Sequence, residues 1–225
     1  MIEDSYLIVG IDEAGRGPVI GNMFIVCLGV NEGKLSKLVE LRVKDSKKLT
    51  PKKRSELAPK ITQLAEVLIV ESVSPQRIDE QNINAIFAKF IIESLEMILR
   101  SGVKIKQVCI DAVSGRKFRD IIMDYAESQN NIMSVRIEPR ADAKYPVVAA
   151  ASIVAKYLRD AHVRRLHMKY GDFGSGYPSD PRTIRWLIKH CNKNNLPPIV
   201  RRSWSTLRKL GISQGSKGLE RWFKI

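Results

Sequence analysis

The feature that most constrains the fold is an apolar run near the start of the chain that ends at two adjacent carboxylates. Residues 6–9 read Tyr-Leu-Ile-Val, and Asp12 and Glu13 follow within four positions. Short β-branched runs of this kind fill the middle of a sheet, and side chains alternate between the two faces of a strand. The carboxylates can therefore cooperate only if the chain turns beside them. Residues 15–17, Gly-Arg-Gly, permit such a turn and add a guanidinium suited to a phosphate, although a plain turn with a solvated arginine remains an alternative.

The rest of the chain alternates between strand and helix patterns. The run at 23–30 follows closely on the first strand, which predicts an antiparallel pair, and Thr50 and Pro51 predict a capped helix start. Apolar residues at helical spacing from Ile83 predict a long helix that Gly102 ends. Further strands are predicted at 64–73, 103–111 and 133–137, and further helices at 118–128, 147–170, 183–191 and 205–210. This alternation predicts α/β layers with functional groups at strand ends.

Length and composition favour a protein with a substantial core. A chain of 225 residues with 44% hydrophobic content can form one large α/β domain or a main domain with a small appendage. No apolar run approaches the ~18 residues of a membrane span, and the start of the chain is acidic, unlike a signal peptide. We therefore expect a cytoplasmic protein. Cys27, Cys109 and Cys191 are far apart, which predicts core thiols in place of disulfides or a zinc site.

The positive charge is concentrated in the last third of the chain. The net charge is +14, and residues 161–225 carry 14 Lys and Arg against 3 Asp and Glu. Such a surface predicts a polyanionic partner, although a merely well-solvated basic surface is the alternative.

Three acids from distant parts of the sequence fall at the ends of predicted elements. Asp12 and Asp111 each end an apolar strand, Asp142 precedes the long helix, and Glu13 is a fourth candidate. Hard oxygen ligands of this type suit Mg²⁺ or Mn²⁺, and two such ions ~4 Å apart can support phosphodiester hydrolysis. Each acid alone also has a structural explanation, as a helix cap or a turn residue. The three histidines all lie in the later basic helices, which disfavours a Ser-His-Asp hydrolase or a histidine-ligated zinc site.

The glycines near the start also raise the possibility of a dinucleotide-binding enzyme. Gly15, Gly17 and Gly21 give the spacing GxGxxxG where that fold uses GxGxxG, Pro18 interrupts the turn, and a strand follows in place of a helix. The sequence therefore disfavours this class.

Five segments carry a family resemblance that covers about residues 6–210. They occur in the order GIDEAGRGPVIG, DSKKLT, CIDAVSG, ADAKYPVVAAASIVAK and GDFGSGYPSDPRT, and together they closely resemble type 2 ribonuclease H, particularly its archaeal form. The resemblance implies a ribonuclease H-like fold, with a mixed central sheet flanked by helices and a C-terminal helical extension. We expect a catalytic domain at 1–170 and a basic extension at 171–225.

The resemblance also implies a reaction. Members of this family cleave the RNA strand of RNA/DNA hybrids and cut 5′ to single ribonucleotides in duplex DNA, leaving 3′-hydroxyl and 5′-phosphate ends, with two divalent ions, Mg²⁺ or Mn²⁺. The implied catalytic and metal-binding carboxylates are Asp12, Glu13, Asp111 and Asp142. The implied substrate-binding residues are Gly15, Arg16, Gly17, Tyr177, Lys47, Lys144 and Lys156.

Some details of the match leave alternatives open. Tyr177 matches the family tyrosine that packs on the sugar next to the ribonucleotide. Without the resemblance, the simpler interpretation is an aromatic side chain that fills space in a glycine-rich loop. Pro139 departs from the residues usual in the family before Asp142 and could redirect the chain there. A catalytically silent hybrid-binding protein is disfavoured, because clustered acids repel a polyanion unless cations bridge them.

The end of the chain suggests a second interaction. Residues 216–223 are similar to the motif by which replication and repair enzymes bind the sliding clamp, with Leu219, Trp222 and Phe223 as the apolar anchors. Ser216 stands where the motif normally has glutamine. One helical turn would put the anchors on one face, and packing on the protein's own surface is the alternative. Otherwise we expect a monomer.

Overall fold

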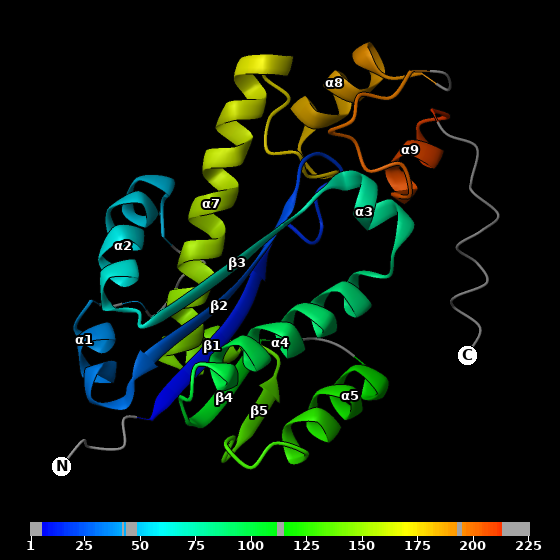
Figure 1. The fold of residues 1–225 in the computed structure, drawn as a ribbon. Helices are drawn as coiled ribbons and strands as arrows, with labels where there is room; N and C mark the ends of the chain where they lie inside the picture. Colours follow the sequence, from blue (N-terminus) through cyan, green and yellow to red (C-terminus); the bar gives the residue numbers. More distant parts are fainter. Residues whose placement is uncertain (1–5, 42, 44–48, 112–114, 193–194, 213–225) are drawn as a thin grey trace.

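A five-stranded mixed sheet forms the centre of the molecule (Figure 1). The computed structural model describes residues 6–41, 43, 49–111, 115–192 and 195–212. The strand order is β3-β2-β1-β4-β5; β2 is antiparallel to β1 and β3, whereas β4 is parallel to both β1 and β5. The bounds are β1 Leu7–Ala14, β2 Met23–Asn31, β3 Val67–Val73, β4 Ile105–Asp111 and β5 Val135–Glu138. The predicted α/β class and the antiparallel first pair are confirmed.

Helices cover both faces of the sheet. On one face, α7 (Pro146–Tyr170) packs on β1 and β2, with α1 (Leu35–Glu40) and α2 (Pro51–Leu64) against it. On the other face lie α4 (Ile83–Arg100) and α5 (Arg116–Glu127). The short elements are η1 Glu32–Lys34, α3 Pro75–Glu80, α6 Ala141–Lys144, α8 Pro181–His190 and α9 Ser205–Lys209.

The alternation of side chains along β1 assigns its residues to two cores. Leu7, Val9 and Ile11 join the core under α4, and Ile8 joins the core under α7. Gly10 faces α7 so closely that an added Cβ would lie 2.4 Å from the carbonyl carbon of Val147. The backbone of α7 therefore rests directly on β1, which brings the helix beside the acidic end of the strand.

Local signals account for most helix ends. The Thr50 hydroxyl accepts a hydrogen bond from the Lys53 amide at 3.2 Å, and Pro51 is the first helical residue, as predicted. Gly102, after α4, has φ +81°. The short helices α1, α3 and α6 were not predicted, because one or two turns give too little periodicity to detect.

The C-terminal segment, which comprises the described residues 171–192 and 195–212, packs against the end of α7 and the loop after β1. Val19 and Ile20 share a buried cluster with Phe173, Trp186 and Leu187 of this segment. Figure 1 places α8 beside the upper end of α7, and α9 farther to the right, near α3. A division of the chain at residue 170 stays a prediction.

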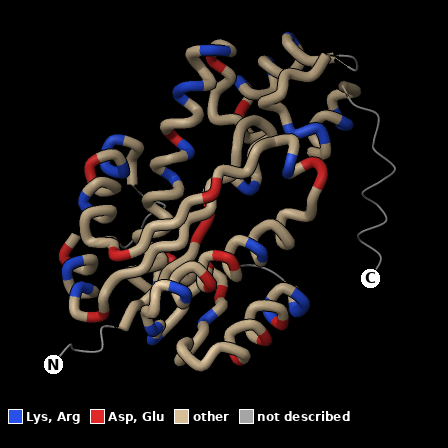
Figure 2. The backbone as a smooth tube through the Cα atoms, viewed as in Figure 1, with Lys and Arg blue, Asp and Glu red and all other residues tan. Residues whose placement is uncertain are grey.

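Basic residues and cysteines lie where the sequence predicts them. Figure 2 shows basic segments along α7 and around α8 and α9. Cys27, Cys109 and Cys191 are buried free thiols, as predicted. Among the described helices, none has the length and apolarity needed to cross a membrane.

Candidate active site

Three carboxylates from three elements meet at one end of the sheet. Asp12 on β1, Asp111 at the end of β4 and Asp142 in α6 each have an oxygen within 4.8 Å of an oxygen of the others. Asp12 and Asp111 meet because β1 and β4 are parallel neighbours, with Ile11 opposite Ile110. The parallel pairing therefore brings together two acids that lie 99 positions apart in the sequence.

A strained turn after β5 brings in the third carboxylate. Arg140 has φ +59°, the only positive φ of a non-glycine residue among those described. Its amide donates a hydrogen bond to Oδ1 of Asp111 at 3.0 Å, and α6 starts at the next residue with Asp142 in its first turn. A non-glycine residue in the left-handed region costs free energy, and such strain concentrates at functional sites. The turn that contains Pro139 thus delivers Asp142 to the cluster.

Burial sets the electrostatics of Asp12. Its side chain is 7% exposed, and desolvation, followed by the charge of Glu13, raises its pKa well above the usual value. A hydrogen bond from Ser152 opposes this shift, and Nζ of Lys156 donates to Oγ of Ser152 at 2.7 Å. The protein groups around Asp12 therefore do not fully offset the cost of burying its negative charge.

Glu13 lies beside this cluster but is directed differently. Its Oε1 accepts from Nε of Arg16 at 2.9 Å, while its Oε2 is buried without a hydrogen-bond partner among the described residues. Burial raises the pKa of Glu13 in spite of Arg16, and Asp111 raises it further. An unpaired buried oxygen next to three clustered carboxylates matches the hard oxygen donor set of a divalent cation. These residues therefore fit a metal such as Mg²⁺ or Mn²⁺.

The Gly-Arg-Gly turn of residues 15–17 follows directly on β1. Gly15 has φ +94°, and a Cβ there would lie 2.9 Å from the carbonyl oxygen of Asn22, so only glycine fits without strain. Nη1 of Arg16 donates to Oδ1 of Asn84 at 2.8 Å, in addition to its bond with Glu13. The guanidinium is thus held between a carboxylate of the site and the start of α4.

The C-terminal segment holds the carbonyl groups of this turn. Arg201 is fully buried and donates to the carbonyl oxygens of Gly15 at 2.6 Å and Arg16 at 2.9 Å. Nε1 of Trp204 donates to the carbonyl oxygen of Gly17 at 2.9 Å. Burial lowers the pKa of Arg201 to about 9, so its guanidinium stays charged at neutral pH. The segment that contains α9 therefore fixes the position of the turn.

A basic cleft of about 390 Å³ opens beside the turn. Its lining combines the turn and Glu13 with positive side chains and with Tyr177, which is 37% exposed. A Cβ on Gly17 would lie 3.4 Å from the Tyr177 ring, so the two predicted residues are neighbours. The residues that line the cleft are Glu13, Ala14, Gly15, Arg16, Gly17, Arg54, Lys156, Arg159, Asp160 and Tyr177.

The predicted lysines differ in their surroundings. Lys156 lines the cleft and contacts Ser152. Lys144 is exposed and pairs with Glu138. Lys47 lies outside the described residues, as do the tail anchors Leu219, Trp222 and Phe223.

Sequence reasoning missed several residues of the site. Ser152 and Arg159 lie at helical spacing from the predicted Lys156 in α7, and Ser152 is polar within the Ala- and Val-rich start of that helix; this pattern could have revealed one functional face. Arg201 and Trp204 gave no such signal. They reach the turn only through the packing of the C-terminal segment, which no local pattern encodes.

Comparison with known proteins identifies the family. The family model described as Ribonuclease HII matches residues 9–207. Ribonuclease HII of Pyrococcus furiosus is 42% identical over 224 residues, which cover 96% of this chain and 97% of that protein.

Two solved structures support the same assignment. The crystal structure of ribonuclease H2 from Pyrococcus horikoshii superposes with a TM-score of 0.79 at 38% identity, covering 97% of this chain and all of that one. A PCNA–ribonuclease HII complex from Archaeoglobus fulgidus gives 0.74 at 36% identity, covering 93% and 98%. The chain therefore belongs to the ribonuclease HII family, and it is a type 2 ribonuclease H, an endonuclease.

Proposed function

We propose that this protein cleaves the RNA strand of RNA/DNA hybrids and cuts 5′ to single ribonucleotides in duplex DNA, leaving 3′-hydroxyl and 5′-phosphate ends. The observation that carries the proposal is the cluster of Asp12, Asp111 and Asp142 beside the Gly-Arg-Gly turn. A carboxylate cluster provides for phosphodiester chemistry, and a glycine turn next to it suits close contact with a sugar–phosphate backbone. Such an activity serves ribonucleotide excision repair.

The proposed cofactor is a pair of divalent ions, Mg²⁺ or Mn²⁺. Asp12, Asp111 and Asp142 would hold them, with Glu13 as a further ligand through its unpaired Oε2. When bound, such ions supply activation of water and neutralisation of the charge on the scissile phosphate. Without a cation, buried carboxylates at this spacing would repel both one another and a nucleic acid.

The turn and Tyr177 are the proposed readers of the ribose. The 2′-hydroxyl distinguishes RNA from DNA, and groups that recognise it must approach the sugar closely. Because residues 15–17 line the cleft and Gly17 carries no side chain, backbone atoms of the turn can make that approach, while Arg16 contacts an adjacent phosphate. Tyr177 lies against Gly17 at the same cleft, where its ring can pack on the neighbouring sugar.

The test is cleavage of a labelled DNA duplex that contains one ribonucleotide, with Mg²⁺, with Mn²⁺ and with EDTA, beside an all-DNA duplex. We expect metal-dependent incision 5′ to the ribonucleotide and no cutting of the all-DNA control. Cleavage of long hybrids alone would contradict the incision at single ribonucleotides. Binding without cleavage would favour the silent hybrid-binding alternative.

A sliding clamp is the proposed protein partner. The family member from Archaeoglobus fulgidus was solved in complex with PCNA. Residues Leu219, Trp222 and Phe223 of this chain have the spacing of the apolar anchors of a clamp-binding motif. Deletion of residues 216–225 should abolish clamp binding in a pull-down or calorimetric titration while incision of free duplex continues. Unchanged clamp binding after the deletion would remove this partner from the proposal.

A further inference from the structure

Arg159 bridges the two parts of the cleft that are proposed to read the ribose. It lies on α7, and its Cδ and Nε would be 3.1 and 3.2 Å from a Cβ on Gly15. On its other side, its guanidinium carbon lies 4.9 Å from the centre of the Tyr177 ring. The same side chain therefore fills the space next to the turn and stacks on the tyrosine.

The arginine is held at this position by specific contacts. Its Nη2 donates to the carbonyl oxygen of Ser175 at 2.8 Å, two residues before Tyr177. Its Nε is buried and has no hydrogen-bond partner among the described residues. An unpaired buried N–H weakens folding, so stability alone does not account for an arginine here.

The loop that carries Tyr177 is also anchored by hydrogen bonds that do not involve Arg159. The amide of Gly176 donates to Oγ1 of Thr183 at 3.0 Å, and its carbonyl oxygen accepts from the Val19 amide at 2.8 Å. Loss of the arginine would therefore leave the path of the loop in place and release mainly the ring of Tyr177. The stack on Arg159 limits the positions that this ring can take.

We propose that Arg159 is a positioning residue for substrate discrimination: it fixes the Tyr177 ring relative to the Gly-Arg-Gly turn, so that the enzyme favours a ribose followed by a deoxyribose. This inference rests on the proposed function, because it assigns Tyr177 to the sugar next to the ribonucleotide. A planar guanidinium stacks on an aromatic ring in a way that an ammonium does not, so the role belongs to arginine and not to positive charge in general.

The test is a double-mutant cycle with Arg159→Met, Tyr177→Ala and the double variant. For each protein, kcat and KM are measured on a duplex with one ribonucleotide and on a long hybrid. Arg159→Met should lower kcat on the single-ribonucleotide duplex by roughly 3- to 30-fold, as expected for loss of a partly desolvated cation–π contact. We expect a smaller loss on the long hybrid, little change in KM, and no additional loss of discrimination when Arg159→Met is added to Tyr177→Ala.

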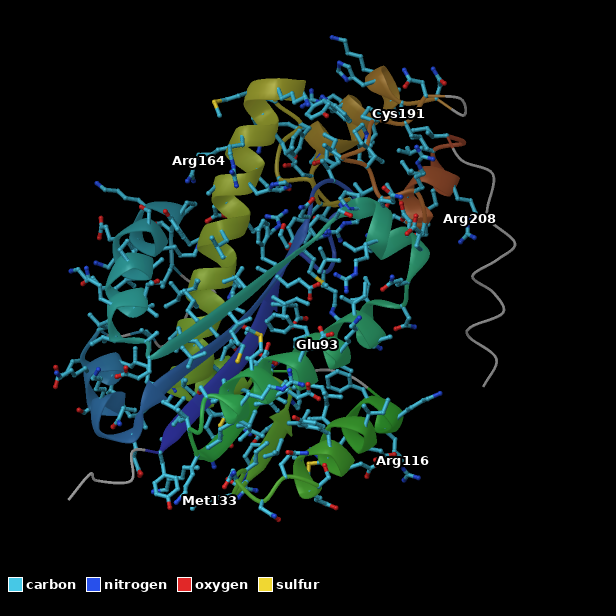
Figure 3. All side chains as sticks on the ribbon, in the orientation of Figure 1. Glu93, Arg116, Met133, Arg164, Cys191 and Arg208 are labelled. Atoms are coloured by element: carbon cyan, nitrogen blue, oxygen red, sulfur yellow. The ribbon has the colours of Figure 1, made fainter. Side chains whose placement is uncertain are left out.

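Two further variants control for charge and for folding. Arg164→Met removes an exposed arginine from the same helix (Figure 3) and should leave the ratio of the two rates unchanged. Arg159→Lys keeps the charge without the planar stack and should behave like Arg159→Met. Thermal unfolding should give similar melting temperatures for Arg159→Met and the wild type, since methionine removes the unpaired N–H as well as the hydrogen bond to Ser175.

The outcomes separate this inference from the function on which it depends. If the wild-type enzyme does not cut at a single ribonucleotide, the proposed function fails. If it cuts there but Tyr177→Ala leaves discrimination intact, the assignment of Tyr177 to the sugar fails, and the role of Arg159 fails with it. If Tyr177→Ala loses discrimination but Arg159→Met keeps it, only the role of Arg159 is overturned. Equal losses on both substrates, full additivity with Tyr177→Ala, or full rescue by Arg159→Lys would also overturn it.

Discussion

At the scale of the residue, the site contains two buried carboxylates, Asp12 and Glu13, whose negative charges the surrounding protein groups do not fully offset. Desolvation and Glu13 raise the pKa of Asp12, and Oε2 of Glu13 is buried without a partner among the described residues. Uncompensated buried charge lowers the stability of the folded state and is retained where a ligand needs it. The metal-free protein should therefore be destabilised at this site.

Asp12→Asn should stabilise the metal-free protein. Because the folded-state pKa of Asp12 is raised, the folded protein binds more protons than the unfolded chain, and stability falls as pH rises from about 4 through the folded pKa. In EDTA near neutral pH, the variant should gain roughly 1 kcal/mol or more, which raises the melting temperature by about 2–4 °C per kcal/mol. Calorimetric melting in EDTA measures this gain. The exposed control Asp124→Asn should change little, and an unaltered or lower melting temperature for Asp12→Asn would contradict the prediction.

Asp142→Asn should separate cleavage from binding. Asp142 is 5% exposed and lies in the carboxylate cluster, so loss of its negative charge should weaken metal binding by the cluster. We expect cleavage to fall at least about 100-fold, because charge stabilisation by a metal contributes several kcal/mol. Hybrid affinity, measured by fluorescence anisotropy, should stay close to that of the wild type. A strong loss of binding would instead make Asp142 a structural residue.

At the scale of the element, α7 carries one face of the site and rests directly on β1. Ser152, Lys156 and Arg159 project from this helix toward Asp12 and the cleft. The close approach is possible because Gly10 has no side chain where the backbone of Val147 passes. The distance between α7 and β1 thus sets the distance between the acids and the basic cleft.

Gly10→Ala should therefore lower the stability of the folded protein. An added Cβ would lie 2.4 to 2.6 Å from backbone atoms of Val147 and Val148, which must move apart. Overpacking of a tight contact costs about 1–3 kcal/mol, and the melting temperature should fall accordingly. Gly115→Ala is a suitable control, since a Cβ there meets no atom of the described residues within 4 Å, its chain neighbours aside. Equal melting temperatures for the two variants would show that α7 does not depend on this glycine.

At the scale of the whole molecule, the C-terminal segment supplies both support and charge. Arg201 and Trp204 bind the carbonyl groups of the turn, so the segment after α8 is part of the site's framework. Residues 161–225 also carry 14 basic against 3 acidic side chains, and Figure 2 shows basic segments there. We expect a duplex bound at the cleft to extend over the described part of this segment.

Affinity for duplex nucleic acid should therefore fall steeply with salt. Each phosphate neutralised contributes about 0.9 to the slope of log K against log salt concentration on B-DNA. Replacing exposed arginines of the C-terminal segment with glutamine should reduce that slope by up to about one unit per lost contact. The variant set is Arg185→Gln, Arg202→Gln and Arg208→Gln, and its control is Lys89→Gln, Lys106→Gln and Lys117→Gln. If the two variant sets gave equal slopes of log K against log salt concentration, the exposed arginines of the C-terminal segment would not be contacting the duplex.

The sequence by itself determined the order of the five strands and of the helices other than the short η1, α1, α3 and α6, and it singled out the four acids and the glycine turn as candidates. Hydrophobic periodicity and capping residues are local properties, so α4 and the start of α2 could be predicted from the residues that form them. Only the tertiary structure decided that Asp12, Asp111 and Asp142 meet while Glu13 turns to Arg16. It likewise decided that Arg159 stacks on Tyr177 and that Arg201 holds the carbonyl group of Gly15. Apart from the Glu13–Arg16 pair, which is three residues apart, these contacts join residues distant in the chain, and their geometry depends on strand pairing and helix packing that no local pattern encodes.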